Sequence, residues 1–217
     1  MQSVGKGKTQ GLSSLKEGST DSEAVASYYD DWAGNYDETL NQWQYQAPDD
    51  AMDLLMPHLP ANARLLDVGC GTGLFGETLS RRGNFRADGI DISAESLKRA
   101  GTRGVYEQLL QHDLQQVPLP VEDKAYDAAA SIGVLTYIED AEALLRDLCR
   151  CVRKDGVITF TQRSDRWAAL DFAATVKRLE TEGLWSVLSI SEPRPYLPGN
   201  EEFGSAIAVI HTLCRVR

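Results

Sequence analysis

Leu65-Leu66-Asp67-Val68-Gly69-Cys70-Gly71-Thr72-Gly73 is the stretch of this chain that decides the fold. An apolar run ends in an acid, glycine then alternates with small residues, and an amphipathic segment follows over 74–82. This order predicts a buried strand, a tight glycine turn and the start of a helix. Glycine lacks a Cβ atom, so such a turn can adopt positive φ and bring its backbone against a ligand. The helix start adds unpaired N–H groups and a partial positive charge.

Two kinds of nucleotide cofactor fit this turn. Gly71-Thr72-Gly73-Leu74-Phe75-Gly76 satisfies the dinucleotide pattern G-x-G-x-x-G, with Asp91 following 20 residues after Gly71. The pattern Asp67-x-Gly69-x-Gly71-x-Gly73 instead resembles motif I of the class I S-adenosylmethionine-dependent methyltransferases. A carboxylate placed just before the turn repels a phosphate and attracts an ammonium or hydroxyl group. Asp67 therefore favours the second interpretation.

Two later acids follow the next two predicted strands. Asp91 lies at the end of the strand predicted within 87–93, where a carboxylate suits both hydroxyls of a ribose. Asp113 follows the apolar run 105–110. The methyltransferase resemblance implies that Asp91 holds the ribose, that Asp113 and Leu114 take the adenine, and that Ile92 also contacts the cofactor. Any one of these acids alone could be a helix cap or a turn residue. Three acids at three successive strand ends favour a methyltransferase over a dehydrogenase.

The resemblance extends to the cofactor's methionine end. It implies that Gly69, Gly71 and Gly73 approach the methionine half and the ribose. The segment 125–133 resembles motif IV, the strand that delivers its end to the transferred methyl group. On that resemblance, the residues beside the cofactor are Ser131, Ile132 and Gly133. The alternative is an ordinary buried strand with a turn at its tip.

The segment Tyr28–Asp37 resembles the signature Tyr-Asp-x-x-Ala-x-x-Tyr-Asp of many small-molecule methyltransferases. In that family the segment forms a lid over the cofactor, with aromatic residues near the methionine end. Aromatic faces also attract a sulfonium cation. We therefore predict cofactor contacts from Tyr29 and Tyr36. The alternative is that these rings only pack the helix against the sheet.

The residues expected to contact the methyl acceptor match family motifs less closely than those expected to contact the cofactor. Val134–Asp140 resembles a Val-Leu-x-His block with Tyr137 in the histidine position. An unperturbed tyrosine has a pKa near ~10, so Tyr137 is interpreted as a hydrogen-bonding or packing residue. Arg163 ends the fifth predicted strand at the same edge, and its fork is suited to clamping a substrate carboxylate or phosphate. The alternative for Arg163 is a salt bridge with Asp165. Residues 192–204 are expected to wall the substrate pocket.

Several motifs that the sequence lacks limit the chemical class of the methyl acceptor. The fourth strand is not followed by Asn/Asp-Pro-Pro-Tyr, which argues against base amines and glutamine amides as acceptors. The sequence shows no Glu/His metal cluster, so a metal-independent reaction is expected. The formal net charge is −10, and the 22 basic residues form no dense cluster, which disfavours nucleic acid as a substrate. We therefore expect methyl transfer to oxygen or nitrogen of a small molecule.

The pattern from residue 63 onward alternates strand and helix. Strands are predicted over 64–68, 86–91, 105–111, 125–131, 156–162, 184–191 and 205–214, and helices over 74–82, 94–100, 139–152 and 165–182. This alternation predicts an α/β fold, a Rossmann-like, mostly parallel seven-stranded sheet with helices on both faces. The first and fourth strands should flank the switch point where such sheets bind ligands. The resemblance implies that the last strand lies antiparallel beside the fifth.

The 217 residues fit one domain. We expect a disordered tail over 1–20 and a single methyltransferase domain over 21–217, made of a helical lid (21–60) and a Rossmann-like core (61–217). A capping box over Thr20–Glu23 should open a first helix reaching Leu40, and a second helix should run over 48–58. The four cysteines suit neither zinc nor a disulfide framework.

No apolar run approaches the ~20 residues of a membrane span, and the N-terminus lacks an apolar signal core, so a cytoplasmic protein is expected.

The lid signature, the loop Gly-Cys-Gly-Thr-Gly-Leu-x-Gly and Thr-x-Arg at 161–163 together are most similar to methyltransferase-like proteins of the Williams–Beuren region. That resemblance implies a monomeric or weakly dimeric enzyme and names no acceptor. Two alternatives keep the cofactor: a lyase or cyclase that uses S-adenosylmethionine, and a non-catalytic cofactor-sensing module.

Overall fold

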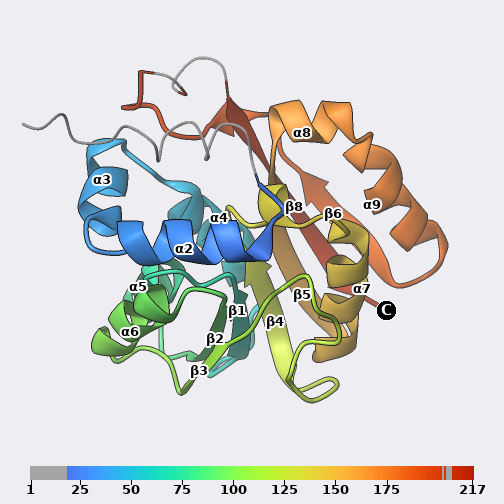
Figure 1. Cartoon of the computed structure of the whole chain (residues 1–217). Helices are drawn as coiled ribbons and strands as arrows, with labels where there is room; N and C mark the ends of the chain where they lie inside the picture. Colours follow the sequence, from blue (N-terminus) through green and yellow to red (C-terminus); the bar gives the residue numbers. More distant parts are fainter. Residues whose placement is uncertain (1–18, 202, 204–206) are drawn as a thin grey trace, which may run out of the picture.

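The computed structural model describes residues 19–201, 203 and 207–217. The tail predicted over 1–20 lies outside the described residues except for its last two. The sheet runs in the order β3-β2-β1-β4-β5-β8-β6 (Figure 1). Its first five strands in that order are mutually parallel: β1 Arg64–Val68, β2 Arg86–Asp91, β3 Gln108–Gln111, β4 Tyr126–Ser131 and β5 Val152–Arg163. The predicted α/β fold is confirmed.

The far side of the sheet is antiparallel. β8 (Ala208–Val216) lies antiparallel between β5 and β6 (Trp185–Ile190), as the family resemblance implied for the last strand. A two-residue strand, β7 (Arg194–Pro195), also pairs with β8, so the described residues form eight strands where seven were predicted. β1 and β4 are neighbours although β2 and β3 lie between them in sequence, which places the switch point where the pattern predicted it.

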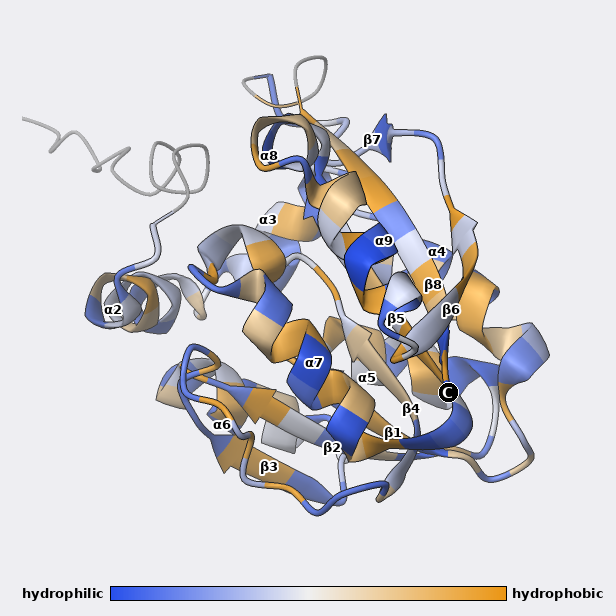
Figure 2. Ribbon diagram, turned by 90° about the vertical axis from the view of Figure 1, so that its right-hand side faces the viewer, coloured by the Kyte–Doolittle hydropathy of each residue, from blue (hydrophilic) through white to orange (hydrophobic). Residues whose placement is uncertain are grey.

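Helices cover both faces of the sheet. One face packs against α7 (Ala141–Cys151) and α9 (Phe172–Thr181), through a core that includes Leu144, Phe160 and Val176. The other packs against α4 (Ala47–Leu55) and α5 (Leu74–Arg82), and α6 (Ala94–Thr102) contacts β2 and β3. Figure 2 shows mostly hydrophobic strands, with hydrophobic and hydrophilic residues alternating along α7. Both faces of the sheet therefore bury apolar side chains.

Two predicted helices are each divided in the structure. The segment expected to be helical up to Leu40 forms α2 (Ser22–Trp32) and α3 (Tyr36–Gln42), separated by a turn that contains Gly34, a poor helix former. The segment 165–182 forms α8 (Ser164–Ala169) and α9, because Asp171 adopts φ 45° between them. A short 3-10 helix, η1 (Met56–His58), continues α4.

The predicted capping box is wrong about the capping residue. Asp21, not Thr20, occupies the N-cap of α2, and its Oδ1 accepts the N–H of Ala24 at 2.8 Å. Aspartate and threonine are both good N-caps, so the sequence did not separate two adjacent candidates.

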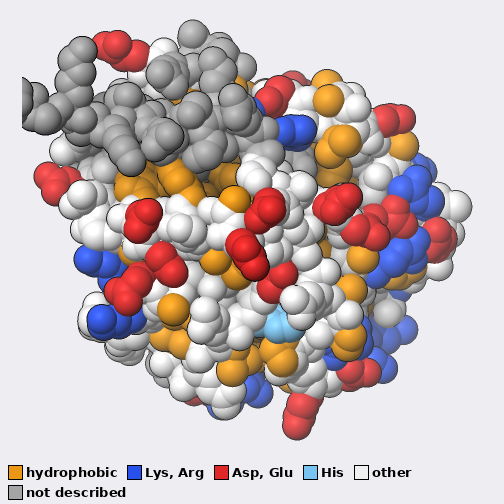
Figure 3. Space-filling view, in the orientation of Figure 1, with side chains coloured by type: hydrophobic (Ala, Val, Ile, Leu, Met, Phe, Trp, Pro, Cys, Tyr) orange, Lys and Arg blue, Asp and Glu red, His pale blue; other side chains and the backbone are white. Residues whose placement is uncertain are grey.

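α2 and α3 lie across the carboxyl ends of the parallel strands (Figure 1). Acidic side chains are spread over the face drawn in Figure 3, and basic ones lie mostly toward its margins. No helix within the described part of the chain is long and apolar enough to cross a membrane.

Candidate active site

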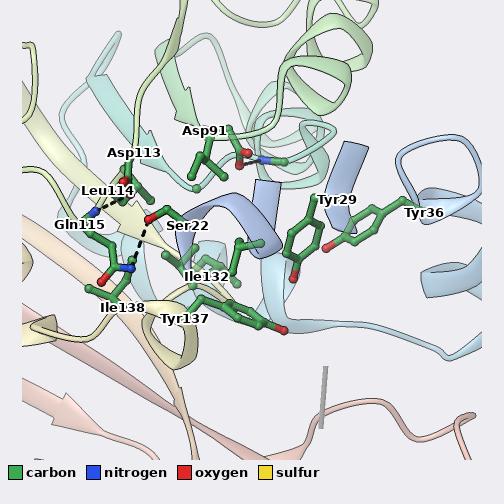
Figure 4. A pocket seen from close by; sticks show the side chains of 16 residues that line it. Ser22, Tyr29, Tyr36, Asp91, Asp113, Leu114, Gln115, Ile132, Tyr137 and Ile138 are labelled. Carbon is green, nitrogen blue, oxygen red and sulfur yellow. Dashed lines mark hydrogen bonds between the residues drawn. The ribbon is translucent and has the colours of Figure 1, made fainter. Parts of the chain in front are cut away.

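A cavity of about 620 Å³ lies at the carboxyl ends of the parallel strands, beneath α2 (Figure 4). Most of the predicted site residues meet there. Those that line the cavity are Tyr29, Tyr36, Gly69, Gly71, Asp91, Ile92, Asp113, Leu114, Ile132, Gly133 and Tyr137. The acids and the tyrosines lie in different parts of it: Figure 4 shows Asp91 and Asp113 on one side and the three labelled tyrosines on another.

The three glycines of the turn meet three different surroundings. A Cβ on Gly69 would lie 2.2 Å from a methyl group of Val134, so only glycine lets these two segments approach. A Cβ on Gly71 would meet nothing within 4 Å, because it would project into open space at the cavity. Gly73 is the N-cap of α5, packed against Arg103 and Tyr106, and it is not part of the cavity wall. Gly73 was predicted to approach the ligand, but in the structure it packs against Arg103 and Tyr106 instead.

Asp91 fastens the glycine turn to the end of β2. Its Oδ2 accepts the N–H of Gly71 at 2.7 Å, and its Oδ1 accepts the N–H of Ser93 at 2.9 Å. Burial raises the pKa of this carboxyl, and the backbone N–H groups partly offset that rise. Two lone pairs, one on each oxygen, remain for hydroxyl donors from the cavity.

The lid contributes residues that sequence reasoning missed. Ser22 and Val25 line the cavity together with Tyr29, and their spacing of three and four residues places them on one face of α2. That helical spacing was the available signal. Gln115 was also missed: its Nε2 donates to Ser22 Oγ at 3.3 Å and its N–H to Asp113 Oδ1 at 3.0 Å. The other missed residues are Val134 and Ile138.

α2 has no buried residue, although its inner face carries Val25 and Tyr29. This face covers the cavity instead of packing on a core. An apolar face above an acid-lined cavity fits a ligand with both an aromatic or aliphatic part and hydroxyl or amino groups. S-adenosylmethionine has this combination, so the residues present fit the cofactor that the sequence suggested.

Two aspartates of the lid signature attach the lid to the loops at the cavity. Asp30 accepts from the hydroxyl of Ser93 at 2.6 Å and from the N–H of Glu95 at 3.1 Å, at the start of α6. Asp37 accepts from the hydroxyl of Thr72 at 2.5 Å in the glycine turn and pairs with Arg103. Lid position and loop geometry are therefore coupled through charged hydrogen bonds.

Asp67 lies beside the main cavity, in a smaller hollow of about 340 Å³ that also includes Tyr36, Tyr45 and Thr72. It is 2% exposed, and its Oδ2 accepts from the hydroxyl of Tyr106 at 2.6 Å. Burial raises the pKa of Asp67 to about 7; the Tyr106 hydrogen bond lowers it and the nearby Asp91 adds to the rise. The carboxyl is thus poised to lose its proton when a cation approaches.

The raised pKa of Asp67 predicts a pH dependence of stability. Between pH 3.8, the ordinary value, and about 7, the folded protein keeps a proton that the unfolded chain has lost. The free energy of unfolding therefore falls as pH rises through this window, by up to about 1.4 kcal/mol per pH unit. The measurement is urea unfolding of the wild type and of Asp67→Asn, each at pH 5 and pH 7.5. The free energy of unfolding should fall more between these two pH values in the wild type than in Asp67→Asn. If the free energy of unfolding fell equally in both proteins, the raised pKa of Asp67 would be contradicted.

A second cavity, of about 450 Å³, adjoins the first and shares Tyr29, Tyr36, Gly133 and Tyr137 with it. We call it the aromatic cavity. Its remaining lining residues are Trp32, Leu40, Tyr45, Thr136, Arg163, Tyr196, Leu197 and Phe203. The hydroxyls of Tyr45 and Tyr196 each lie 3.2 Å from the position that a Cβ on Gly133 would take. Gly133 thus leaves room for both hydroxyls at the end of β4.

The two residues predicted on the acceptor side of the site, Tyr137 and Arg163, both line the aromatic cavity. Tyr137 contacts Tyr29 edge to face, with ring centroids 5.8 Å apart. Arg163 is 5% exposed and forms a bidentate ion pair with Asp165, through Nε at 3.0 Å and Nη2 at 2.6 Å. The salt bridge considered as the alternative for Arg163 is therefore present, while the same side chain also lines the cavity.

Ser131 departs from the prediction. It is fully buried and lines neither cavity. Its register partner on β5 is Phe160, whose ring belongs to the core beneath α7 and α9. Side chains paired across neighbouring strands share a face, so Ser131 points into that core. Side chains alternate between the two faces of a strand, and the sequence did not show which face of β4 Ser131 occupies.

The comparisons with known proteins agree with this geometry. A family model described as a methyltransferase domain matches residues 66–160. Human methyltransferase-like protein 27 is 33% identical over 168 residues, which cover 74% of this chain and 68% of that protein. Malonyl-[acyl-carrier protein] O-methyltransferase of Serratia marcescens is 32% identical over 157 residues, covering 69% of this chain and 59% of that protein. The chain thus spans less than two thirds of the Serratia protein.

Among solved structures, the [4+2]-cyclase SpnF aligns with a TM-score of 0.61 at 20% identity, covering 79% of this chain and 81% of that one. This similarity concerns the fold. The sequence relationship to the human protein, together with the glycine turn and the ordered acids around one cavity, identifies the family. The chain belongs to the class I S-adenosylmethionine-dependent methyltransferases, and S-adenosylmethionine is its cofactor.

Proposed function

We propose that this enzyme transfers a methyl group to an oxygen or nitrogen atom of a small molecule, without a metal ion. In this proposal residues 21–217 act as one domain, in the cytoplasm, as a monomer or weak dimer that binds neither nucleic acid nor membrane. The observation that carries the proposal is the pair of adjoining cavities. One has the acids and glycines suited to the cofactor, and the other, lined mainly by aromatic side chains, is suited to contact a small acceptor.

The cofactor roles follow the geometry of the first cavity. We assign the ribose to Asp91 and Ile92, the adenine to Asp113 and Leu114, and the methionine end to the glycine turn and the lid tyrosines. Asp67 is assigned to the methionine ammonium group, because its carboxyl ionises readily beside a cation. Gly133, which follows β4, lines both cavities, and Ile132 lines the first one.

The bound cofactor supplies a methyl group on a sulfonium sulfur, which leaves as a neutral thioether. The protein's own contribution is to position the acceptor and to exclude water, and positioning of this kind is worth about 7–11 kcal/mol in favourable cases. Tyr29, Tyr36 and Tyr137 separate the two cavities and are the residues best placed to align the acceptor. Arg163 would orient an anionic group of the substrate.

Product analysis tests this proposal. The full chain is incubated with S-adenosylmethionine labelled with ¹³C at the methyl group and a mixture of small oxygen and nitrogen acceptors, with and without EDTA. We expect S-adenosylhomocysteine to form in equal amount to a product labelled at oxygen or nitrogen, unaffected by EDTA. A product labelled only at carbon, or loss of activity with EDTA, would refute the acceptor class or the metal independence, respectively.

The alternative reactions differ in products. A cyclase or lyase would use the cofactor without forming a methylated acceptor, and a sensing module would bind it without turnover. SpnF, a cyclase, has the same fold, so the fold alone does not choose between these activities. The ratio of S-adenosylhomocysteine to methylated product separates them.

A further inference from the structure

The aromatic cavity combines one charged residue with several phenols. Of its lining residues that the structure describes, Arg163 is the one that is charged at neutral pH. Asp165 pairs with Arg163 but is not part of the cavity wall, and its side chain is 45% exposed. The ion pair therefore holds the guanidinium in place at the wall of the cavity.

The phenols of this cavity keep their protons. Desolvation by burial raises the pKa of Tyr29, Tyr36 and Tyr45 well above the ordinary value, and the neighbouring Tyr137 and Tyr196 raise it further at all three. The pKa values of Tyr137 and Tyr196 are raised for the same reason, although the charge of Arg163 opposes the rise at both. Arg163 therefore acts electrostatically on the hydroxyls that surround the cavity.

A cavity with this lining offers no general base. The described lining contains no carboxylate, histidine, lysine or thiol, and the phenols are too weakly acidic to exist as phenolates at neutral pH. An alcohol or phenol acceptor must lose a proton as it is methylated. The acceptor that suits this cavity is therefore one that arrives already deprotonated.

We propose that the methyl acceptor is a carboxylate, held by the charge of Arg163 and the hydroxyl groups of the cavity tyrosines, and that the product is a methyl ester. This inference rests on the proposed function. A carboxylate is ionised at neutral pH and needs no base. A free amine or a thiolate also needs none, but an amine is mostly a cation at neutral pH and is repelled by Arg163, and a thiol is mostly protonated.

Methyl transfer to a carboxylate balances in atoms and electrons without any proton transfer. A carboxylate oxygen supplies the electron pair of the new C–O bond, the pair of the broken C–S bond stays on sulfur, and the products are a neutral ester and a neutral thioether. An anion and a cation thus neutralise each other. An aromatic cavity of low polarity favours such a step, because little charge is left to be solvated.

Binding provides a test that does not depend on turnover. Calorimetry on the full chain saturated with S-adenosylhomocysteine compares phenylacetate, hexanoate and benzoate with their neutral amides and with benzylamine. We expect at least one acid to bind at least about tenfold more tightly than its amide and than benzylamine. Arg163→Gln should abolish this preference and Arg163→Lys should retain part of it. The control Arg166→Gln, in the adjoining helix α8 and outside both cavities, should retain it fully.

Turnover supplies the second test. With S-adenosylmethionine tritiated at the methyl group, a methyl ester releases volatile tritiated methanol after mild alkali, whereas a methylamine or an ether does not. We expect alkali-labile label from the acid that binds, with KM raised at least about tenfold in Arg163→Gln.

Three outcomes would overturn the inference: no acid preferred over its amide, label only in alkali-stable products, or an acid preference unchanged by Arg163→Gln. Binding of S-adenosylhomocysteine is measured first. If it binds and the label appears in benzylamine, the carboxylate inference fails and the proposed function stands. If no acceptor of any kind is methylated, both fail.

Discussion

Gly71→Leu is expected to weaken binding of S-adenosylmethionine by more than about 100-fold, which corresponds to roughly 2.8 kcal/mol. Gly71 lines the first cavity, and a Cβ at this position would meet no protein atom within 4 Å. A leucine side chain there would occupy the space assigned to the cofactor without first clashing with the protein. Calorimetric titration with S-adenosylhomocysteine measures the effect directly.

The matched control for this change is Gly183→Leu. Both glycines have positive φ, 53° and 82°, and neither would bring a Cβ within 4 Å of another atom. Both leucine variants should therefore lose a similar amount of stability, about 1–2 kcal/mol, from the left-handed backbone. Gly183 follows α9, away from the cavity, so Gly183→Leu should bind the cofactor normally. Equal affinity in the two variants would mean that the cofactor does not pass Gly71.

Asp91→Ala is expected to weaken cofactor binding by about 10- to 150-fold, equivalent to 1.5–3 kcal/mol for hydrogen bonds to a charged group. The substitution removes the proposed ribose acceptor and leaves the N–H groups of Gly71 and Ser93 without their partner. Asp91→Asn should not restore the affinity, because both carboxylate oxygens accept backbone N–H groups and an amide offers only one acceptor.

Asp127→Ala is the control for Asp91→Ala. Asp127 also accepts a backbone N–H, from Arg64 at 2.8 Å, but at the opposite edge of the sheet, where β1 begins. Its replacement should destabilise the fold without changing the dissociation constant of S-adenosylhomocysteine, measured well below both unfolding temperatures. A loss of affinity in both variants would show that general destabilisation, not a ribose contact, explains the effect of Asp91→Ala.

The sequence predicted well wherever one local pattern requires one geometry. An apolar run before Asp67 and a glycine turn leave few alternatives to strand, turn and helix, and parallel strands bring their carboxyl ends to one edge. For this reason Gly71, Asp91 and Asp113 were predicted together and lie around one cavity. Helix ends were predicted less well, since Thr20 and Asp21 are both acceptable caps and the break at Asp171 depends on a single backbone angle.

By itself, the sequence determined the α/β fold, the switch point between β1 and β4 and the identity of the methyl donor, because short-range patterns carry these features. Only the tertiary structure decided the rest of the site. It directed Ser131 into the core, packed Gly73 against Arg103, and added Tyr45 and Thr136 to the predicted Arg163 and segment 192–204 around one aromatic cavity. These residues lie far apart in the chain, and their side chains meet only through the packing of the lid, β5 and the segment after β7. The acceptor site is built from such long-range contacts, which no local pattern encodes.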